Sequence, residues 1–194
     1  MGTLSNNKVK ALKKKMLLHT CCANCVLYPV SILSPDYDIT LFFYNPNIQP
    51  EYEYQKRLES VKSAASSLNI SLIVPDYHPE EFNILASPFK DEPEGGKRCG
   101  ICFELRLSET AKYAAKNNFD IFGTTLTVSP HKNSQIINNA GRQISGKYHI
   151  DFYIADFKKQ DGFKKTMQLS GKMGIYRQNY CGCIYSIRDR ILPG

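Results

Sequence analysis

Short apolar runs alternate with amphipathic segments along the chain. The runs are rich in β-branched and aromatic residues, which is typical of buried strands, and they cover residues 16–18, 38–45, 71–74, 120–128 and 148–157. Between them lie segments with helical spacing or helical composition, at residues 26–33, 51–68, 103–118 and 133–144, and a further helix start at Pro79. Strands alternating with helices predict a mostly parallel sheet of about five strands with helices on both faces. The predicted fold class is therefore a three-layer α/β domain with a helical C-terminal segment.

The length of the chain suits one domain. Its 194 residues contain no internal repeat and no linker. The first residues, MGTLSNNKVKALKKK, are polar and rich in lysine, so we expect residues 1–13 to be a flexible basic tail and residues 14–194 to form the α/β domain. Since no segment has the apolar length of a membrane span or a secretion signal, we expect a cytoplasmic protein.

Seven cysteines fall into three tight groups: Cys21, Cys22 and Cys25; Cys99 and Cys102; Cys181 and Cys183. Such grouping is typical of metal and redox sites and not of a disulfide framework. The first two groups offer four thiolates, from Cys21, Cys22, Cys99 and Cys102, which we expect on two loops at strand ends.

Four soft sulfur ligands suit an iron–sulfur cluster or tetrahedral zinc. The adjacent pair, Cys21 and Cys22, is unlike the usual zinc knuckle and favours the cluster, but the spacing alone does not decide. Cys25 is either a spare ligand or a small core residue.

The sequence YCGC, from Tyr180 to Cys183, predicts a different kind of site, a redox-active disulfide. A disulfide between Cys181 and Cys183 closes a small ring, and Gly182 is the residue that best tolerates the backbone distortion. A strained disulfide is readily reduced, so this pair can cycle between dithiol and disulfide. A second metal half-site and two purely structural cysteines are the alternatives.

Polar residues follow two of the later strands. Gly123 to Ser134 combines hydroxyl groups with His131 and Lys132, which suits a phosphate or a polar base, although threonines are also ordinary strand residues. Asp156 is a candidate metal ligand, proton donor or helix cap. His131 and Tyr180 are the other candidate proton donors.

The charge is unevenly spread. The net charge is +7, five lysines precede Met16, and ten Lys and Arg residues face four acidic residues from Arg142 onward. Such a distribution suits a polyanion such as RNA, the alternative being a solubilising surface. A nucleotide triphosphatase is excluded, because Gly141 to Tyr148 has Tyr148 in place of the Ser or Thr of a phosphate loop.

With these pieces in place, the chain resembles the QueH-type epoxyqueuosine reductases, which are cobalamin-independent. The resemblance rests on motifs that span nearly the whole chain in order. They are LLHTCCANC (Leu17 to Cys25), FFYNPNIQPEYEYQKRL (Phe42 to Leu58), KRCGICFELRL (Lys97 to Leu107), GTTLTVSPHKN (Gly123 to Asn133), DFKK (Asp156 to Lys159) and YRQNYCGC (Tyr176 to Cys183). One departure is Lys158, where the family pattern DFRK has arginine; the charge is kept but the planar fork is lost.

The resemblance implies a Rossmann-like catalytic domain of the HUP type. It also implies the two-electron deoxygenation of epoxyqueuosine to queuosine at the wobble position of tRNAs with GUN anticodons. It implies that Cys21, Cys22, Cys99 and Cys102 hold a [4Fe–4S] cluster and that Cys181 and Cys183 are a redox-active pair, with Asp156 as a further catalytic residue. A second mononuclear metal, iron or zinc, has Cys25, Asp156 and Cys183 as candidate ligands. The partners are an external electron donor and the tRNA anticodon stem-loop. The expected substrate and RNA contacts are Thr124, Thr125, Ser129, Lys132, Lys158, Lys159 and Arg177.

Two other functions stay open at this point. One is a zinc-stabilised RNA-binding module without redox chemistry. The other is a tRNA-thiolating enzyme of the related ATP-using fold, which is disfavoured because CCAN stands where that fold has its pyrophosphate loop.

Overall fold

A five-stranded parallel sheet forms the centre of the structure, a computed structural model that describes residues 12–191. The strands are β1 (Lys14–His19), β2 (Tyr37–Phe42), β3 (Ser71–Ile73), β4 (Ile121–Thr124) and β5 (Asp151–Phe152). Their order is β3-β2-β1-β4-β5, and every pairing is parallel. The predicted fold class is confirmed. Residues 1–11 of the predicted tail lie outside the described residues.

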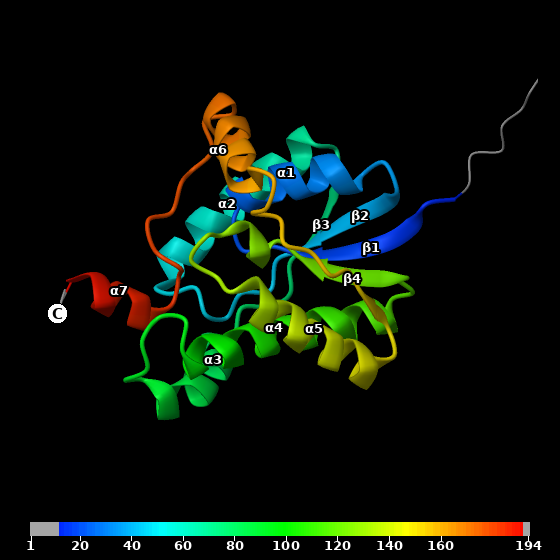
Figure 1. Ribbon diagram of the computed structural model, residues 1–194. Helices are drawn as coiled ribbons and strands as arrows, with labels where there is room; N and C mark the ends of the chain where they lie inside the picture. Colours follow the sequence, from blue (N-terminus) through cyan, green and yellow to red (C-terminus); the bar gives the residue numbers. More distant parts are fainter. Residues whose placement is uncertain (1–11, 192–194) are drawn as a thin grey trace, which may run out of the picture.

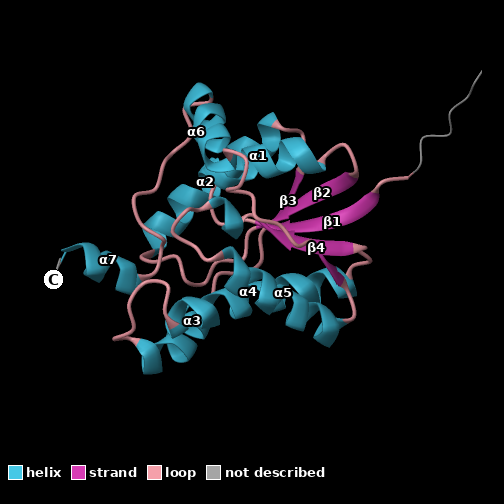
Figure 2. Ribbon diagram, viewed as in Figure 1, coloured by secondary structure: helices cyan, strands magenta, loops and turns pink. Residues whose placement is uncertain are grey.

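Helices cover both faces of this sheet (Figures 1 and 2). One face carries α1 (Asn24–Leu33), α2 (Glu51–Ser67) and α6 (Gly162–Lys172). The other carries α3 (Pro79–Ala86), α4 (Lys97–Lys116) and α5 (Ser134–Tyr148), and α7 (Ile184–Ile191) lies at the end of the molecule. Two short 3-10 turns follow α3 and β4, at Ser87–Phe89 and Leu126–Val128. α1 packs against α6, and α4 packs against α5.

Burial explains the central position of β1. Lys14 and Lys15 are exposed where the strand begins, whereas Met16, Leu17 and Leu18 are fully buried between β2 and β4. A strand covered on both faces reads as a continuous apolar run. The carboxyl end of β1 therefore opens at the middle of the sheet edge, where ligands bind in folds of this class.

Three predicted strands were too long. The strand predicted over residues 38–45 ends at Phe42. β4 ends at Thr124, because the Thr124 hydroxyl accepts a hydrogen bond from the Leu126 backbone N–H at 3.2 Å and turns the chain into the 3-10 helix. Tyr148 belongs to α5, which ends at His149 with a positive φ of 53°, and β5 keeps only two residues. The aromatic alternation over residues 148–157 therefore spans the end of α5 and does not mark a single long strand.

A further correction concerns the element on which Cys99 and Cys102 lie. We expected them on a loop at a strand end, but both lie within the first turns of α4, and the loop before them follows a helix.

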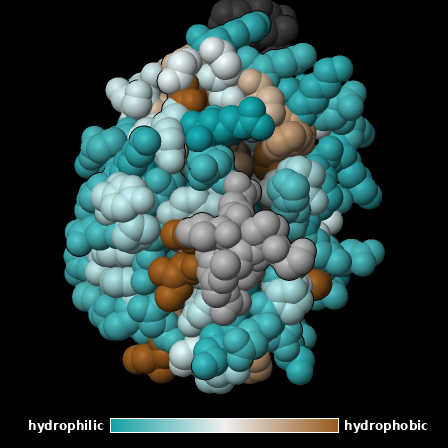
Figure 3. All heavy atoms as spheres, turned by 90° about the vertical axis from the view of Figure 1, so that its left-hand side faces the viewer, coloured by the Kyte–Doolittle hydropathy of each residue, from teal (hydrophilic) through white to brown (hydrophobic). Residues whose placement is uncertain are grey.

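Within residues 12–191 no helix has the length and apolar character needed to cross a membrane. The face that bears α7 is largely hydrophilic, with small apolar groups scattered over it (Figure 3).

Candidate functional site

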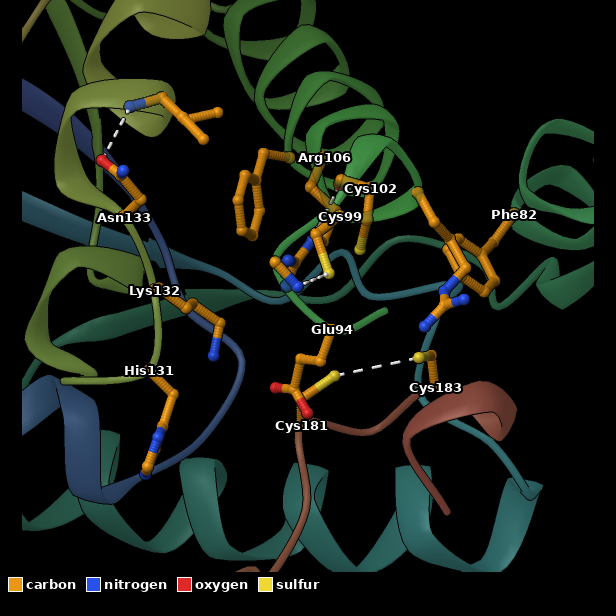
Figure 4. Close-up of a pocket in the computed structure, with 14 residues that line it drawn as sticks. Phe82, Glu94, Cys99, Cys102, Arg106, His131, Lys132, Asn133, Cys181 and Cys183 are labelled. Atoms are coloured by element: carbon orange, nitrogen blue, oxygen red, sulfur yellow. Dashed lines mark hydrogen bonds between the residues drawn. The ribbon is translucent and has the colours of Figure 1, made fainter. Parts of the chain in front are cut away.

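Thiols from three parts of the chain lie at one end of the sheet, and Figure 4 shows those of two parts, Cys99 and Cys102 and Cys181 and Cys183. Cys21 and Cys22 are buried in the turn between β1 and α1. Cys99 and Cys102, one helical turn apart on α4, project into a cavity that Cys181 and Cys183 line from the segment before α7. All seven cysteines are free thiols. The structure therefore brings the three groups of cysteines to one end of the sheet.

Two cations face these thiols. Arg106 on α4 is 2% exposed, and its Nε donates a hydrogen bond to the Cys102 carbonyl oxygen at 3.1 Å. Arg106 and Lys132 line the same cavity as Cys102 and Cys181. Burial lowers the pKa of Arg106, but the thiolate forms of the surrounding cysteines together raise that pKa above its usual value; these are Cys102, Cys21, Cys181 and Cys99. The cysteines of this cavity thus lie in a field that favours their negatively charged, deprotonated form.

The thiols of Cys21, Cys99 and Cys102 are held mainly in the neutral form. Burial raises the pKa of Cys102 to about 11, and burial also raises the pKa of Cys99. The hydrogen bond with Cys22, together with burial, raises the pKa of Cys21 well above its usual range. Buried, protonated thiols beside two cations are typical of sites in which a bound metal group displaces the protons of the thiols.

Among the described residues, no three His, Cys, Asp or Glu side chains converge closely enough to hold one metal ion. Cys21, Cys22, Cys99 and Cys102 nevertheless offer four free thiols at the same end of the sheet. Their chemistry suits a metal group bound through sulfur, which both an iron–sulfur cluster and tetrahedral zinc accept.

Cys181 and Cys183 form a close pair. Their sulfur atoms lie 3.9 Å apart, and Gly182 between them has a φ of +121°, as glycine tolerates best. The hydrogen bond between the thiols lowers the pKa of Cys181 and raises that of Cys183, and Lys132 lowers the pKa of Cys181 further. One thiolate beside one thiol is the form in which a dithiol reacts.

A buried ion pair on α2 anchors this segment. Arg57 is 1% exposed, and its Nε donates to Glu53 Oε1 at 2.7 Å. Its Nη1 donates to the Cys181 carbonyl and its Nη2 to the Tyr180 carbonyl, both at 3.1 Å. The Tyr176 hydroxyl donates to Glu53, at 3.0 Å from Oε2. Cys181 is thereby fixed relative to the helix.

A second cavity, of about 470 Å³, lies beside the thiol cavity. Glu94, His131, Lys132 and Cys181 line both cavities. The second cavity is also lined by Cys21, Asn24, Cys25, Arg57, Ser129, Phe163, Thr166, Met167, Arg177, Gln178 and Tyr180. A molecule in this space would therefore contact Cys181.

A third, open hollow of about 590 Å³ contains Asp156, Lys158 and Lys159. Asp156 accepts a hydrogen bond from the Ser134 hydroxyl at 2.9 Å, and its other oxygen lies 3.4 Å from Lys158 Nζ. His131 and Lys132 line this hollow as well as the two cavities. Among the predicted ligands of a second metal, Cys25, Asp156 and Cys183 thus lie in three different spaces, and the structure does not bring them together.

Thr124 and Thr125 hold the end of β4. Both are buried, the Thr124 hydroxyl lies 3.0 Å from His19 Nδ1, and the Thr125 hydroxyl lies 3.5 Å from Thr20 Oγ1. Neither threonine lines the three spaces described here. Of the residues expected to contact substrate or RNA, Ser129 and Arg177 line the second cavity, Lys132 lines all three, and Lys158 and Lys159 line the hollow.

Arg57, Glu53 and Arg106 are site residues that the sequence analysis missed. Each lies next to an apolar stripe of its helix, so periodicity alone marks it as a surface residue. The available signal for the first two was the acid–base pair at positions i and i+4 in a segment that carries the family resemblance.

A sequence model of the family described as "Epoxyqueuosine reductase QueH" matches residues 16–189. The chain belongs to the QueH family. It is 39% identical over 178 residues to the epoxyqueuosine reductase QueH of Thermotoga maritima, covering 90% of this chain and 91% of the relative. It is 37% identical over 185 residues to that of Streptococcus pyogenes serotype M1, covering 92% and 72%.

One solved structure supports the fold of this QueH chain. It is described as a predicted subunit of tRNA methyltransferase from Methanocaldococcus jannaschii, and it matches with a TM-score of 0.55 at 14% identity, covering 83% of this chain and 76% of that one. At this identity the likeness concerns the α/β fold alone.

Proposed function

We propose that this chain reduces epoxyqueuosine to queuosine in tRNA. Membership of the QueH family supports this activity. The observation that carries it is that Cys181, one sulfur of a close dithiol pair, lines both the thiol cavity and the neighbouring 470 Å³ cavity. A substrate in the second cavity would lie between this dithiol and Cys21.

The redox balance requires a two-electron donor. Conversion of an epoxide to an alkene takes up two electrons and two protons and releases one water molecule. Oxidation of Cys181 and Cys183 from dithiol to disulfide supplies two electrons and two protons. An external electron donor then reduces the disulfide for the next turnover.

We infer that Cys21, Cys22, Cys99 and Cys102 hold a [4Fe–4S] cluster. Four cysteine thiols and the two facing cations, Arg106 and Lys132, support this inference. When bound, such a cluster supplies electrons singly. Cys181 and Cys183 would hold both electrons of the reaction together as a dithiol.

His131 is the best candidate for the proton donor. It lines both cavities and the hollow, so it reaches the space beside Cys181. Tyr180 already donates its hydroxyl proton to the Gln49 carbonyl at 2.7 Å, and Asp156 is held by Ser134 and Lys158. Polar side chains that line the second cavity, such as Asn24, Ser129 and Gln178, would orient the substrate.

The basic residues support a role in RNA binding. Lys158 and Lys159 line the open hollow, and Lys164, Lys165 and Arg177 are exposed around α6 and the second cavity. We propose that these side chains contact phosphates of the anticodon stem-loop, while the target base enters the second cavity.

Anaerobic purification with metal and activity assays tests the proposed function. We expect about four irons per chain, a brown chromophore and conversion of epoxyqueuosine in tRNA when a reductant is supplied. Colourless protein with stoichiometric zinc and no turnover would instead support the zinc-stabilised RNA-binding module.

A further inference from the structure

The two sulfur atoms of the Cys181 and Cys183 pair differ in what can reach them. Cys181 is partly exposed and lines both the thiol cavity and the 470 Å³ cavity. Cys183 is 4% exposed and, of the three spaces, lines only the thiol cavity. The lining of the larger cavity includes the exposed residues His131, Arg177 and Asn179, so this cavity opens to solvent. A molecule that enters from outside therefore meets Cys181.

Apolar packing covers Cys183. It belongs to a buried cluster with Phe82, Ala86 and Cys102. Figure 4 shows Cys183 on the side of Phe82, away from Lys132, which lines the larger cavity. An external sulfur atom therefore cannot approach Cys183 unless this packing moves.

The backbone between the two cysteines is held in place. The Gly182 carbonyl oxygen accepts a hydrogen bond from the Gln49 backbone N–H at 2.8 Å, and the Cys181 carbonyl oxygen accepts one from Arg57 at 3.1 Å. Since both carbonyl groups are held, the segment keeps Cys181 toward the larger cavity and Cys183 toward the apolar cluster.

The charge of the larger cavity suits an incoming thiolate. Arg57, Lys132 and Arg177 line it, and within the described part of the chain Glu94 is its only acidic lining residue. The thiolate is the attacking form in thiol–disulfide exchange, and positive charge raises its local concentration. The volume of about 470 Å³ lies within the range of pockets that hold small ligands.

We propose that a dithiol small enough to enter the 470 Å³ cavity regenerates the pair by attacking Cys181. This inference rests on the proposed function, in which the pair is oxidised to a disulfide and the target base occupies the same cavity. The dithiol and the RNA therefore use the cavity in turn. Cys181 is the attacked sulfur, and Cys183 is the sulfur that leaves.

The exchange balances in two steps. A thiolate of the donor bonds to the Cys181 sulfur, the bond between Cys181 and Cys183 breaks, and Cys183 leaves as a thiolate that takes up a proton. The second donor thiol then attacks the first donor sulfur and releases Cys181, so the donor leaves as a disulfide. Two electrons and two protons pass from the donor to the pair. Cys181 has the lower pKa and would be the better leaving group, but a sulfur atom out of reach is not attacked, so access decides.

Single substitutions of the pair test which sulfur is reached. Cys183→Ser keeps only the proposed attacked sulfur, and Cys181→Ser keeps only the covered one. The tryptic peptide 178–188 then contains one cysteine in each variant, so its mass assigns a mixed disulfide directly. With glutathione disulfide as the probe and anaerobically purified protein, Cys183→Ser should form the mixed disulfide about 10-fold faster than Cys181→Ser or more. In denaturant the two variants should react within about threefold of each other, because the difference in access belongs to the fold.

Oxidised wild type tests the shared cavity. Dithiothreitol should restore both thiols of the folded protein, as counted in peptide 178–188. A saturating amount of anticodon stem-loop RNA should slow this reduction about 10-fold or more, because RNA blocks access to the disulfide. A blunt RNA duplex of the same length is the matched control, and it should leave the rate within about threefold of that without RNA.

Three results would overturn the proposal. One is equal or faster reaction at Cys183 in the folded variants, and another is reduction of the oxidised pair at the same rate with and without the stem-loop. The third is a pair that resists dithiothreitol and is restored only by a one-electron reductant such as reduced methyl viologen. Failure of the proposed function looks different: wild type does not convert epoxyqueuosine with any reductant, whereas the faster reaction at Cys181 and the reduction by dithiothreitol are still measured.

Discussion

Arg57 donates a hydrogen bond from Nη1 to the carbonyl oxygen of Cys181 at 3.1 Å. A residue of the α/β core thereby fixes the backbone of one member of the proposed redox pair. The same guanidinium donates to the Tyr180 carbonyl and to Glu53, so one of its donors is used within α2 and two on the segment before α7. Lysine has the same charge but a single ammonium group and cannot reproduce this planar fork.

Arg57→Lys should therefore loosen the segment around Cys181. We expect turnover to fall about 10-fold or more and stability to fall by about 1–3 kcal/mol, because buried carbonyls lose donors. Hydrogen exchange over residues 176–183 should speed up. Lys62→Gln is the control, since Lys62 lies on the same helix in an exposed pair with Glu59. Unchanged exchange together with unchanged turnover would contradict an anchoring role.

Gly182→Ala should destabilise the same segment. Gly182 has a φ of +121°, and an added Cβ would lie 3.0 Å from Ile48 Cγ1 and 3.1 Å from Arg57 Nη1. We expect a loss of about 1–3 kcal/mol in unfolding free energy, measured by denaturant titration.

Gly171→Ala provides the contrast. Gly171 lies in α6, and an added Cβ there meets no atom within 4 Å. Because alanine is the better helix former by about 1 kcal/mol, this change should be neutral or stabilising. Two changes of the same chemistry should thus have opposite effects, and equal effects would mean that the Gly182 conformation is not under strain.

The sequence was sufficient to predict the sheet, because Met16 to Leu18 form an apolar run of the length that a doubly covered strand requires. It also predicted α2 closely, from apolar residues spaced by three and four. It failed at Thr124 and Tyr148, where a side-chain hydrogen bond and a left-handed helix end overrode the strand composition. Local composition does not contain these tertiary contacts.

The gathering of the cysteines at one end of the sheet was predictable, since the family resemblance rests on their motifs. The roles of charged and polar residues around them were less so. Arg57 acts through backbone carbonyls more than 120 positions away in the sequence, and Asp156 is diverted to Ser134 and Lys158. Such pairings arise only when distant segments meet, so a pattern read along one chain does not contain them.

Charge reversal at Lys164 and Lys165 should weaken tRNA binding. Each neutralised phosphate releases counterions, so a double change to Glu should lower the affinity and flatten the dependence of log K on log salt by roughly 0.7–0.9 for each phosphate that is no longer neutralised. Affinity measured at several salt concentrations checks this. Lys62→Glu and Lys112→Glu, on exposed positions of α2 and α4, are the controls. If the slope of log K against log salt is unchanged in the Lys164 and Lys165 variant, the RNA-binding surface lies elsewhere on the protein.

The cysteines should divide into two groups with different responses to substitution. If Cys99 is a cluster ligand, Cys99→Ser removes a soft thiolate and should reduce iron content, chromophore and stability together. The same should hold for Cys21, Cys22 and Cys102. Cys181→Ser and Cys183→Ser should instead keep iron and absorbance close to those of wild type while abolishing turnover, because a single thiol cannot close an intramolecular disulfide.

Thiol counting in denaturant tests the pair directly. Oxidised wild type should hide two thiols that reappear on reduction, and both lie in the tryptic peptide 178–188, which contains no other cysteine. Their sulfur separation of 3.9 Å means that closure requires only a small movement of the chain around Gly182. If Cys181→Ser strips iron as fully as Cys99→Ser does, the pair is a ligand set, and the two electrons of the reaction must come from another group.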